Sequence, residues 1–365
     1  MNNMYIIVNG KAESATEQQD PPDKYYSVGN FHPNNFTYGG AGATAQCKMK
    51  GKLDWKYQAG GAIVSAPAVV NGVVYAGSED YSLFALNATT GKFMWRFTTG
   101  FYVTSTPAVV NGKVYFGSDD HYVYALDASN GKLAWKYQTG YFVESNPAVV
   151  NGVVYISSDD GSLYALNAST GKLIWQTYTN SSYSSPAVVN GIVYVGSSYD
   201  YVDALSAGSG KMLWQFPTGN QVKSSPLVVN GIVYVGCYDY NVYAIDATDG
   251  SLDWKYNTGG YGISASATEA NGIVYIGDAG GHLYALNAGD GSLIWKDSTN
   301  VDILTAPTVA YGAVYAGLEN VYAFNAYTGD KIWQYGTGQG FTTTTVANGL
   351  VYAGSSDTHI YALYV

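Results

Sequence analysis

The sequence has little charge, a single arginine and no long apolar run. Only 12% of its 365 residues are charged, against about 25% in a typical soluble chain, and the formal net charge is −10. Nucleic-acid binding needs clustered lysine and arginine, so this balance argues against a nucleic-acid partner. Arg96 is the single arginine, which nearly excludes a site built on a guanidinium clamp. No apolar run approaches the 18 residues of a membrane helix, so we expect no membrane span.

Cysteine is also scarce. Cys47 and Cys237 lie far apart and fit neither a disulfide framework nor a CxxC metal or redox motif, so we expect two free thiols. Residues 1–8 are too short and too polar for the apolar core of a signal peptide. The abundance of Tyr, Asn, Thr and Gly with little Lys is nevertheless typical of exported proteins. We therefore expect an exported protein, in the cell envelope or outside the cell, whose signal peptide is not visible.

Aromatic and apolar residues are abundant, and they recur regularly. The chain has 36 tyrosines and is 47% hydrophobic, enough for a large core, which argues against disorder. Its eight tryptophans are separated by 40, 40, 40, 39, 40, 41 and 38 residues: Trp55, Trp95, Trp135, Trp175, Trp214, Trp254, Trp295 and Trp333. A period near 40 with short strands predicts a β-propeller, with one four-stranded blade for each repeat.

One full repeat shows the unit. Short β-branched and aromatic runs alternate with Gly, Asn and Asp turns, which predicts four strands and little helix. The runs and turns are Ser145–Val150, Asn151-Gly152, Val153–Ile156, Asp159–Ser162, Leu163–Leu166 and Lys172–Trp175. The two-residue Asn-Gly turn is a strong hairpin signal, because both of its positions need positive φ.

This hairpin recurs eight times, so the sequence predicts an all-β, eight-bladed propeller. The turns are Asn71-Gly72, Asn111-Gly112, Asn151-Gly152, Asn190-Gly191, Asn230-Gly231, Asn271-Gly272, Tyr311-Gly312 and Asn348-Gly349. The repeat region, residues 51–365, opens with a lone fourth strand around Trp55 and ends with a third strand, Ile360–Leu363. We therefore expect a three-plus-one closure, in which the N-terminal strand completes the C-terminal blade and no open edge remains. Residues 1–50 are expected to form an N-terminal arm and a segment that packs on the ring.

The segment from Ala85 to Trp95 resembles the tryptophan-docking motif of the pyrroloquinoline-quinone (PQQ) repeat propellers. It reads Ala-Leu-Asn-Ala-Thr-Thr-Gly-Lys-Phe-Met-Trp. Similar copies end at Trp135, Trp175 and Trp295, and weaker ones at Trp214, Trp254 and Trp333. The resemblance implies that each indole stacks on the backbone of the next blade, so that the tryptophans form a structural girdle. The family includes a scaffold lipoprotein of outer-membrane barrel assembly and quinoprotein dehydrogenases.

The loops between the fourth strand of one blade and the first strand of the next differ most between copies, so we expect function there. These loops should line the mouth of the central channel with aromatic and polar side chains, which is typical of a small-ligand site. The candidate funnel residues are Tyr102, Tyr141, Phe142, Glu144, Tyr183, Gln221, Lys223, Tyr261, Asp302 and Phe341. The alternative is that the tyrosines only cap the blade ends. Glu144 and Lys223 are either channel charges that want a partner or a ligand, or solvated rim charges.

The remaining polar residues suggest no catalytic or metal site. Asp residues recur in the turns between the second and third strands, where Asp usually bonds its own backbone. His121, His282 and His359 lie in different blades, too far apart for one metal. No histidine lies on the variable loops to activate a nucleophile. We therefore expect no catalytic residues, no metal and no resident cofactor.

Three functions remain open. The first is a non-enzymatic binding or scaffold propeller, most simply a monomer, that presents its Tyr-rich loop face and funnel to a protein or small ligand. The second, implied by the resemblance, is a PQQ-dependent alcohol or sugar dehydrogenase with calcium. In that case Lys223 would serve as the cation beside the quinone, and Glu144 or Asp302 as metal ligand or base. The third is a glycan-binding surface protein that uses the tyrosines. Fold alone does not decide between them, and we favour the first.

Overall fold

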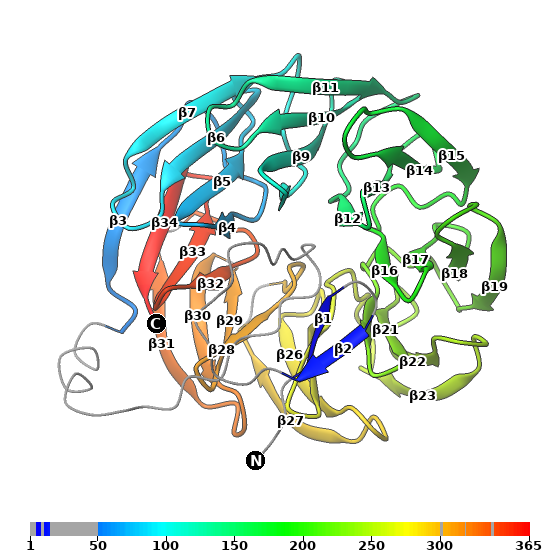
Figure 1. Cartoon of the computed structure of the whole chain (residues 1–365). Helices are drawn as coiled ribbons and strands as arrows, with labels where there is room; N and C mark the ends of the chain where they lie inside the picture. Colours follow the sequence, from blue (N-terminus) through cyan, green and yellow to red (C-terminus); the bar gives the residue numbers. More distant parts are fainter. Residues whose placement is uncertain (1–4, 9–10, 15–49, 300–301, 318, 337–338) are drawn as a thin grey trace.

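Each repeat folds into a four-stranded antiparallel sheet, and eight such sheets form a ring (Figure 1). The computed structural model describes residues 5–8, 11–14, 50–299, 302–317, 319–336 and 339–365. The predicted eight-bladed β-propeller is confirmed. A separate antiparallel pair is formed by β1 (Tyr5–Val8) and β2 (Lys11–Ser14). The rest of residues 1–49 lies outside the described residues, so the predicted arm and ring-packing segment stay a prediction.

In seven blades the strands run outward from the channel in chain order, and in the last blade the outermost strand is the N-terminal β3. The innermost strands are β4 (Ala68–Val70), β8 (Ala108–Val110), β12 (Ala148–Val150), β16 (Ala187–Val189), β20 (Leu227–Val229), β24 (Thr268–Ala270), β28 (Thr308–Ala310) and β32 (Thr345–Ala347). The second strands are β5 (Val73–Gly77), β9 (Lys113–Ser118), β13 (Val153–Ser157), β17 (Ile192–Gly196), β21 (Ile232–Gly236), β25 (Ile273–Gly277), β29 (Ala313–Gly317) and β33 (Leu350–Gly354).

The outer half of each blade holds its third and fourth strands. The third strands are β6 (Ser82–Asn87), β10 (Tyr122–Asp127), β14 (Ser162–Asn167), β18 (Tyr201–Ser206), β22 (Asn241–Asp246), β26 (His282–Asn287), β30 (Asn320–Asn325) and β34 (His359–Tyr364). The outermost strands are β7 (Phe93–Thr98), β11 (Leu133–Gln138), β15 (Leu173–Tyr178), β19 (Met212–Pro217), β23 (Leu252–Asn257), β27 (Leu293–Ser298), β31 (Lys331–Gly336) and β3 (Leu53–Gln58).

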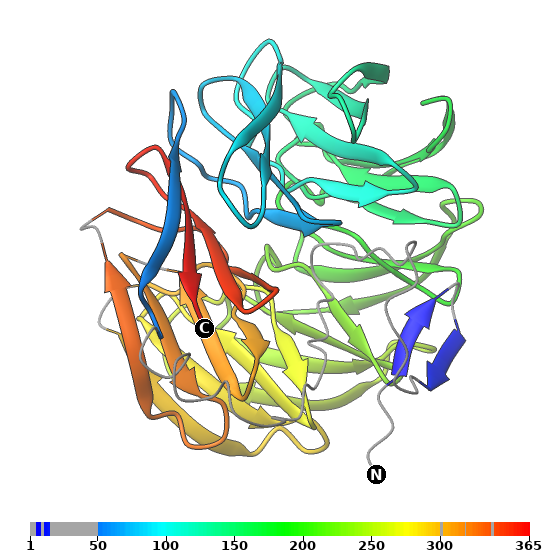
Figure 2. The same cartoon turned by 60° about the vertical axis from the view of Figure 1, so that its left-hand side comes forward.

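The ring closes through its two ends. Strand β3 pairs antiparallel with β34, with Lys56 opposite Tyr361, and completes the sheet of β32, β33 and β34. Figure 2 shows this N-terminal strand beside the C-terminal one. The Tyr364 hydroxyl also donates to Asp54 Oδ1 at 2.7 Å. The predicted three-plus-one closure is therefore confirmed, and no blade is left with an open third strand.

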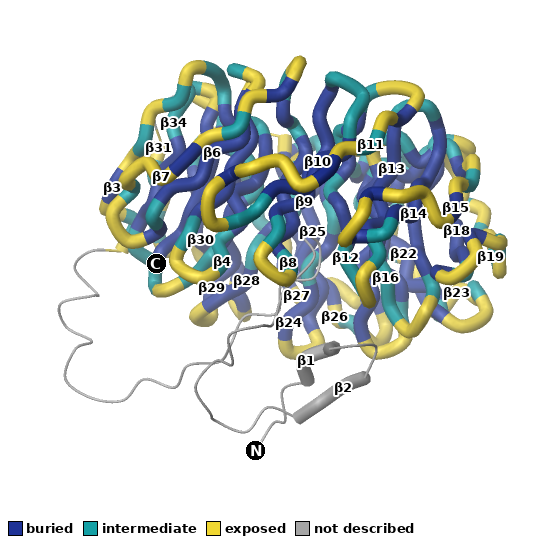
Figure 3. The backbone as a smooth tube through the Cα atoms, turned by 45° about the horizontal axis from the view of Figure 1, so that its top comes forward, coloured by how far each residue is buried: buried dark blue, intermediate teal, exposed yellow. Residues whose placement is uncertain are grey.

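The core lies between neighbouring blades, and Figure 3 shows the buried segments within the blades and the exposed ones mostly at their turns. The second and third strands are buried almost throughout, whereas most outermost strands bury mainly the tryptophan. One such cluster joins Tyr115 and Trp135 of the second blade to Val154 and Leu166 of the third. Because the two sides of each cluster come from different blades, every blade depends on its neighbours for its core.

The tryptophans connect consecutive blades at their outer edges. Trp135 Nε1 donates to Ala168 O at 2.9 Å, and the Tyr115 hydroxyl donates to the same oxygen at 3.1 Å. The indole also covers Gly171, where an added Cβ would lie 2.7 Å from the ring and φ is +70°. Equivalent indole bonds join Trp55 to Ala88, Trp95 to Ala128, Trp175 to Ala207, Trp214 to Ala247, Trp254 to Ala288 and Trp295 to Ala326. Trp333 lies against Gly51.

Candidate functional site

One face of the ring carries the loops between blades and the turns between second and third strands; we call it the loop face. Within each loop, alternate residues are buried and partly exposed. Val143 and Ser145 are buried, for example, whereas Glu144 and Asn146 between and after them reach the channel side. The loop position two residues before the innermost strand therefore lines the channel in every blade, and the position four residues before it does so in five blades.

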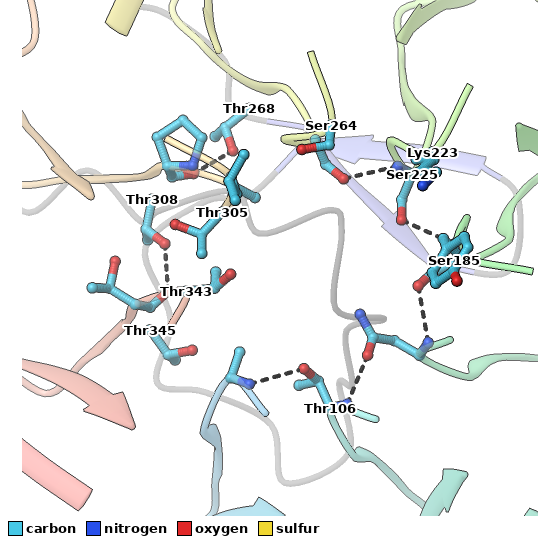
Figure 4. A pocket seen from close by; sticks show the side chains of 18 of the residues that line it. Thr106, Ser185, Lys223, Ser225, Ser264, Thr268, Thr305, Thr308, Thr343 and Thr345 are labelled. Carbon is cyan, nitrogen blue, oxygen red and sulfur yellow. Dashed lines mark hydrogen bonds between the residues drawn. The ribbon is translucent and has the colours of Figure 1, made fainter. Parts of the chain in front are cut away.

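The position two residues before the innermost strand builds a ring of hydrogen bonds around the channel, which we call the inner ring (Figure 4). Its first five junctions join a backbone N–H to the side-chain oxygen of the next blade. The pairs are Ala66 to Thr106, Thr106 to Asn146, Asn146 to Ser185, Ser185 to Ser225 and Ser225 to Ser266, at 2.7–3.1 Å. These bonds fix the spacing of the first six blades.

The last three junctions use a different bond. Here the first residue of the innermost strand is threonine, and its hydroxyl donates to a backbone carbonyl of the next blade. The pairs are Thr268 to Pro307, Thr308 to Thr344 and Thr345 to Pro67, at 2.5–2.6 Å. All eight junctions of the ring are thus bonded, and the funnel has a rigid hydroxyl-rich wall.

The channel widens into a cavity of about 230 Å³. The position four residues before the innermost strand supplies its variable side chains. Five consecutive blades contribute, in order, Glu144, Tyr183, Lys223, Ser264 and Leu304. Three of the ten sequence-predicted funnel residues, Glu144, Tyr183 and Lys223, therefore meet in one cavity.

Tyr183 comes from the loop between those that carry the two charges of this cavity, Glu144 and Lys223. The Lys223 ammonium is 4.6 Å from the centre of the Tyr183 ring and 5.2 Å from that of Tyr238, so two aromatic faces hold it. Burial raises the pKa of the Glu144 carboxyl above its ordinary value. Burial, with Asp159 and Glu144 nearby, also raises the pKa of Tyr183. The charge of Glu144 therefore contributes to the raised pKa of Tyr183.

The other predicted residues lie around the cavity and not in its wall. Tyr141 and Phe142 pack on each other at 4.3 Å between ring centres, and Phe142 is 6.4 Å from Phe101. Tyr102 packs on Phe101 at 4.3 Å. Tyr261 contacts His282 at 5.8 Å. Two polar candidates remain. Gln221 is partly exposed, and Asp302 is exposed.

Phe341 is placed differently from the funnel position expected for it. It occupies the position of Glu144 in the last loop, yet it is only 6% exposed. Its ring packs in the core of the last two blades, 5.3 Å from that of Tyr361. The cavity wall at this junction is instead made by threonines 343–345.

Exposed aromatic side chains gather on the loop face, and we call this set the aromatic rim. It comprises Tyr81, Phe101, Tyr141, Tyr178, Tyr183, Tyr199, Tyr201, Tyr240 and Tyr261, each 37–60% exposed. Several touch one another: Tyr81 stacks on Phe101 at 5.4 Å, and the Tyr178 and Tyr199 hydroxyls are 3.3 Å apart. The rim follows the first six blades.

Two carboxyls that the sequence did not single out also lie near Glu144. Burial raises the pKa of Asp119 to about 6 and that of Asp159 to about 7, and neighbouring Glu144 adds to both shifts. Thr104 donates to Asp119 at 3.0 Å, whereas Asp159 Oδ1 has no hydrogen-bond partner in the described part of the chain. Their signal in the sequence is the Asp-Asp doublet, whose first residue lies near Glu144 and whose second holds the loop.

The second residue of each doublet has a structural role. Asp120 Oδ2 accepts from Gly100 N at 2.7 Å, and Asp160 Oδ2 accepts from Gly140 N at 2.8 Å. Each carboxylate therefore ties a loop to the following blade. Within the described ranges, no group of three or more His, Cys, Asp or Glu side chains could hold a metal ion.

Asp159 gives a pH prediction. Its pKa is raised on folding, so the protonated form favours the folded state, and the unfolding free energy falls as pH rises from about 4 through 7. We expect Asp159→Asn to raise the unfolding free energy by about 1–2 kcal/mol at pH 8 and by almost nothing at pH 4. Thermal melts of the unmodified protein and of Asp159→Asn between pH 4 and pH 8 measure this difference. Asp297→Asn, on an outer strand, is the control, and an equal gain for both variants at pH 8 would contradict the assignment.

The fold and the docking tryptophans define this protein as a PQQ-like repeat β-propeller. Family models agree: one described as outer membrane protein assembly factor BamB matches residues 34–101, 91–185 and 180–364. The chain belongs to that family. Among curated proteins, no sequence matches significantly.

Solved structures with the same fold include both an assembly factor and enzymes. BamB from Moraxella catarrhalis has a TM-score of 0.75 at 17% identity and covers 86% of this chain and 99% of its own. A europium-containing methanol dehydrogenase has 0.73 at 14%, covering 86% and 93%. Quinohemoprotein alcohol dehydrogenase ADHIIG from Pseudomonas putida HK5 has 0.71 at 16%, covering 86% and 76%. At these identities the likeness shows the fold alone.

Two further observations concern the whole ring. The described residues include no helix that could cross a membrane. Cys237 is buried and free, and burial raises the pKa of its thiol to about 12, so it is unreactive at neutral pH. Cys47 lies outside the described residues.

Proposed function

We propose that this protein is a non-enzymatic binding propeller of the cell envelope, which docks a partner protein on its aromatic rim. The observation that carries the proposal is the concentration of exposed aromatic side chains on the loop face. Tyrosine supplies a large contact area, few rotatable bonds and a polar hydroxyl, and it is enriched at protein interfaces. Among the described residues, fewer exposed aromatics lie toward the opposite face: Tyr311, Tyr327 and, at the start of β7, Phe93.

The family supports a protein partner and an exported location. Its description, outer membrane protein assembly factor, points to a scaffold in the assembly of outer membrane proteins. A rigid ring suits that role, because a partner that docks on the rim meets side chains already held by neighbouring rings. The predicted monomer fits the same role, since every described blade of the ring finds its fourth strand within this chain.

Site-specific cross-linking tests this proposal. We expect a photoreactive residue at Tyr141, Tyr199 or Tyr261 to give one discrete protein adduct in cells. The same residue on the outer strands, at Leu133, Ile174 or Ile294, should give none. The rim variant Tyr141→Ser/Tyr199→Ser, probed at Tyr261, should lose the adduct while keeping its melting temperature. Equal adducts from both sets, or none from the rim, would overturn the proposal. Binding of soluble glycans to the rim instead would favour the glycan-binding alternative.

A PQQ-dependent dehydrogenase is the second candidate, favoured by Lys223 in the funnel and by the alcohol dehydrogenases among the similar folds. The described residues fit that cofactor poorly. Arg96 lies exposed on the outer strand β7, and the funnel presents no cluster of acidic side chains able to hold calcium. Titration of PQQ with and without calcium, followed by tryptophan fluorescence, separates the candidates: saturable binding with a raised melting temperature would favour the enzyme.

A further inference from the structure

Two opposite charges line the funnel, and among the described residues neither has an ionic partner, although Lys223 contacts two tyrosine rings. Glu144 and Lys223 occupy the same position in loops two blades apart and border the same cavity. In the described part of the chain, no ion pair within 4.0 Å joins them, and neither charged group makes a hydrogen bond. A charge in a partly desolvated cleft is costly unless it is paired, so a ligand that pairs both would be bound favourably.

Tyr183 comes from the loop between those that carry the two charges. It borders the same cavity, and the centre of its ring lies 4.6 Å from the Lys223 ammonium. Because the described residues leave the carboxylate and the ammonium without an ion pair, a molecule that carries both charges would pair each of them at once.

The rest of the wall suits a small polar molecule. Ser264, Thr305 and Thr343 bring hydroxyls to the cavity, and Leu304 is its one large aliphatic side chain among the described residues. At about 230 Å³ the space equals that of roughly eight liquid waters at about 30 Å³ each. This is sufficient for an amino acid or a very short peptide.

We propose that the funnel binds a small zwitterion, an α-amino acid or short peptide, with its ammonium group toward Glu144 and its carboxylate toward Lys223. The Tyr183 ring would lie beneath the segment that links the two groups. This inference deepens the binding function proposed above and rests on it, since it names the chemistry of the funnel inside the aromatic rim. The raised pKa of Glu144 agrees with a carboxyl that lacks a cationic partner.

A series of simple probes tests the inference on the full chain. Isothermal titration calorimetry with glycine, glycylglycine and triglycine varies the separation of the two charges, while methylammonium and acetate each supply one. We expect at least one zwitterion to saturate the protein with a Kd of about 1 mM or tighter, and the singly charged probes to bind at least about tenfold more weakly.

Variants assign the two charges. Glu144→Gln and Lys223→Met should each weaken binding of the best zwitterion by about tenfold or more, without lowering the melting temperature. The charge-swapped double variant Glu144→Lys/Lys223→Glu should recover binding, because a small zwitterion can enter reversed. Lys136→Met is the matched control. Lys136 lies on outer strand β11, away from the funnel, and its ammonium is 4.1 Å from the centre of the Tyr122 ring.

Three outcomes would overturn the inference. They are no binding of any zwitterion up to about 10 mM, equal binding of the singly charged probes, or the same loss for Lys136→Met as for Lys223→Met. The rim cross-linking is independent of these measurements. An adduct from the rim without zwitterion binding would leave the docking function standing and remove only the funnel ligand, whereas loss of both would remove the binding function itself.

Discussion

A chain that begins at residue 60 is expected to melt more than about 10 °C below the full chain and to aggregate. Such a deletion removes β3, so β34 is left with an unpaired edge. It also removes Trp55, whose indole donates to Ala88 O at 2.9 Å and lies against Gly91 of the first blade. The last blade therefore loses its fourth strand and its outer contact with the first blade at once. Differential scanning calorimetry with light scattering measures the two effects.

A chain that begins at residue 50 is the control for this deletion. It keeps Gly51, β3 and every described contact of the ring, so we expect its melting temperature to match that of the full chain. The same control tests the proposal that residues 51–365 form the domain and residues 1–50 an appendage. An unchanged melt after removal of residues 51–59 would contradict the role of the closure in stability.

The second large effect is expected for Trp135→Ala, which should lower the unfolding free energy by about 3–5 kcal/mol. The substitution removes the indole from Gly171 and from the cluster that joins the second and third blades. It also leaves the carbonyl of Ala168 with the Tyr115 hydroxyl as its remaining side-chain donor. Urea unfolding followed by circular dichroism measures the change.

Two companion variants separate the indole from its surroundings. Leu133→Ala lies on the same strand with a side chain 47% exposed, and it should change stability by no more than about 0.5 kcal/mol. Tyr115→Phe keeps the ring and loses one bond to Ala168, for an expected cost of about 1 kcal/mol. Similar losses for Trp135→Ala and Leu133→Ala would contradict the docking role of the tryptophan.

The fold could be predicted from the sequence because local signals and the repeat agree. Asn151 and Gly152 both adopt positive φ, 50° and 76°, as the hairpin requires. The lone strand around Trp55 and the missing fourth strand after Leu363 together indicated the closure, and the register of β3 on β34 confirms it. In such repeats each signal recurs eight times, so one irregular copy, such as Tyr311-Gly312, does not obscure the pattern.

The site could be predicted only to the level of the loop. Sequence indicates which segments vary, but the direction of each side chain depends on the alternation within the folded loop. Glu144 and Lys223 point to the channel because they lie four residues before an innermost strand, whereas Tyr102 and Asp302 lie six before and miss the cavity. Phe341 has the right position but packs on Tyr361, since a hydrophobic ring gains more from the core.

Asp119 and Asp159 escaped notice for a different reason. A carboxylate in a turn usually bonds its own backbone, and the adjacent Asp120 and Asp160 tie loops in a related way. Only the packing of the loops around them shows that the first residue of each pair is held near Glu144, where burial raises its pKa. Desolvation is a property of the assembled ring, and residue order alone does not contain it.

The inner ring gives the blades a fixed order. Ala66, in the first blade, has no side-chain oxygen. The last blade bonds the first blade by a different contact, in which the Thr345 hydroxyl donates to the Pro67 carbonyl. If the first blade stood in third place, Ala66 would take the position of Asn146, and the Thr106 N–H would lose its acceptor. Opening the chain at another junction and joining the present ends would preserve every neighbour. The protein should therefore tolerate circular permutation far better than shuffling of its blades, although their sequences look interchangeable.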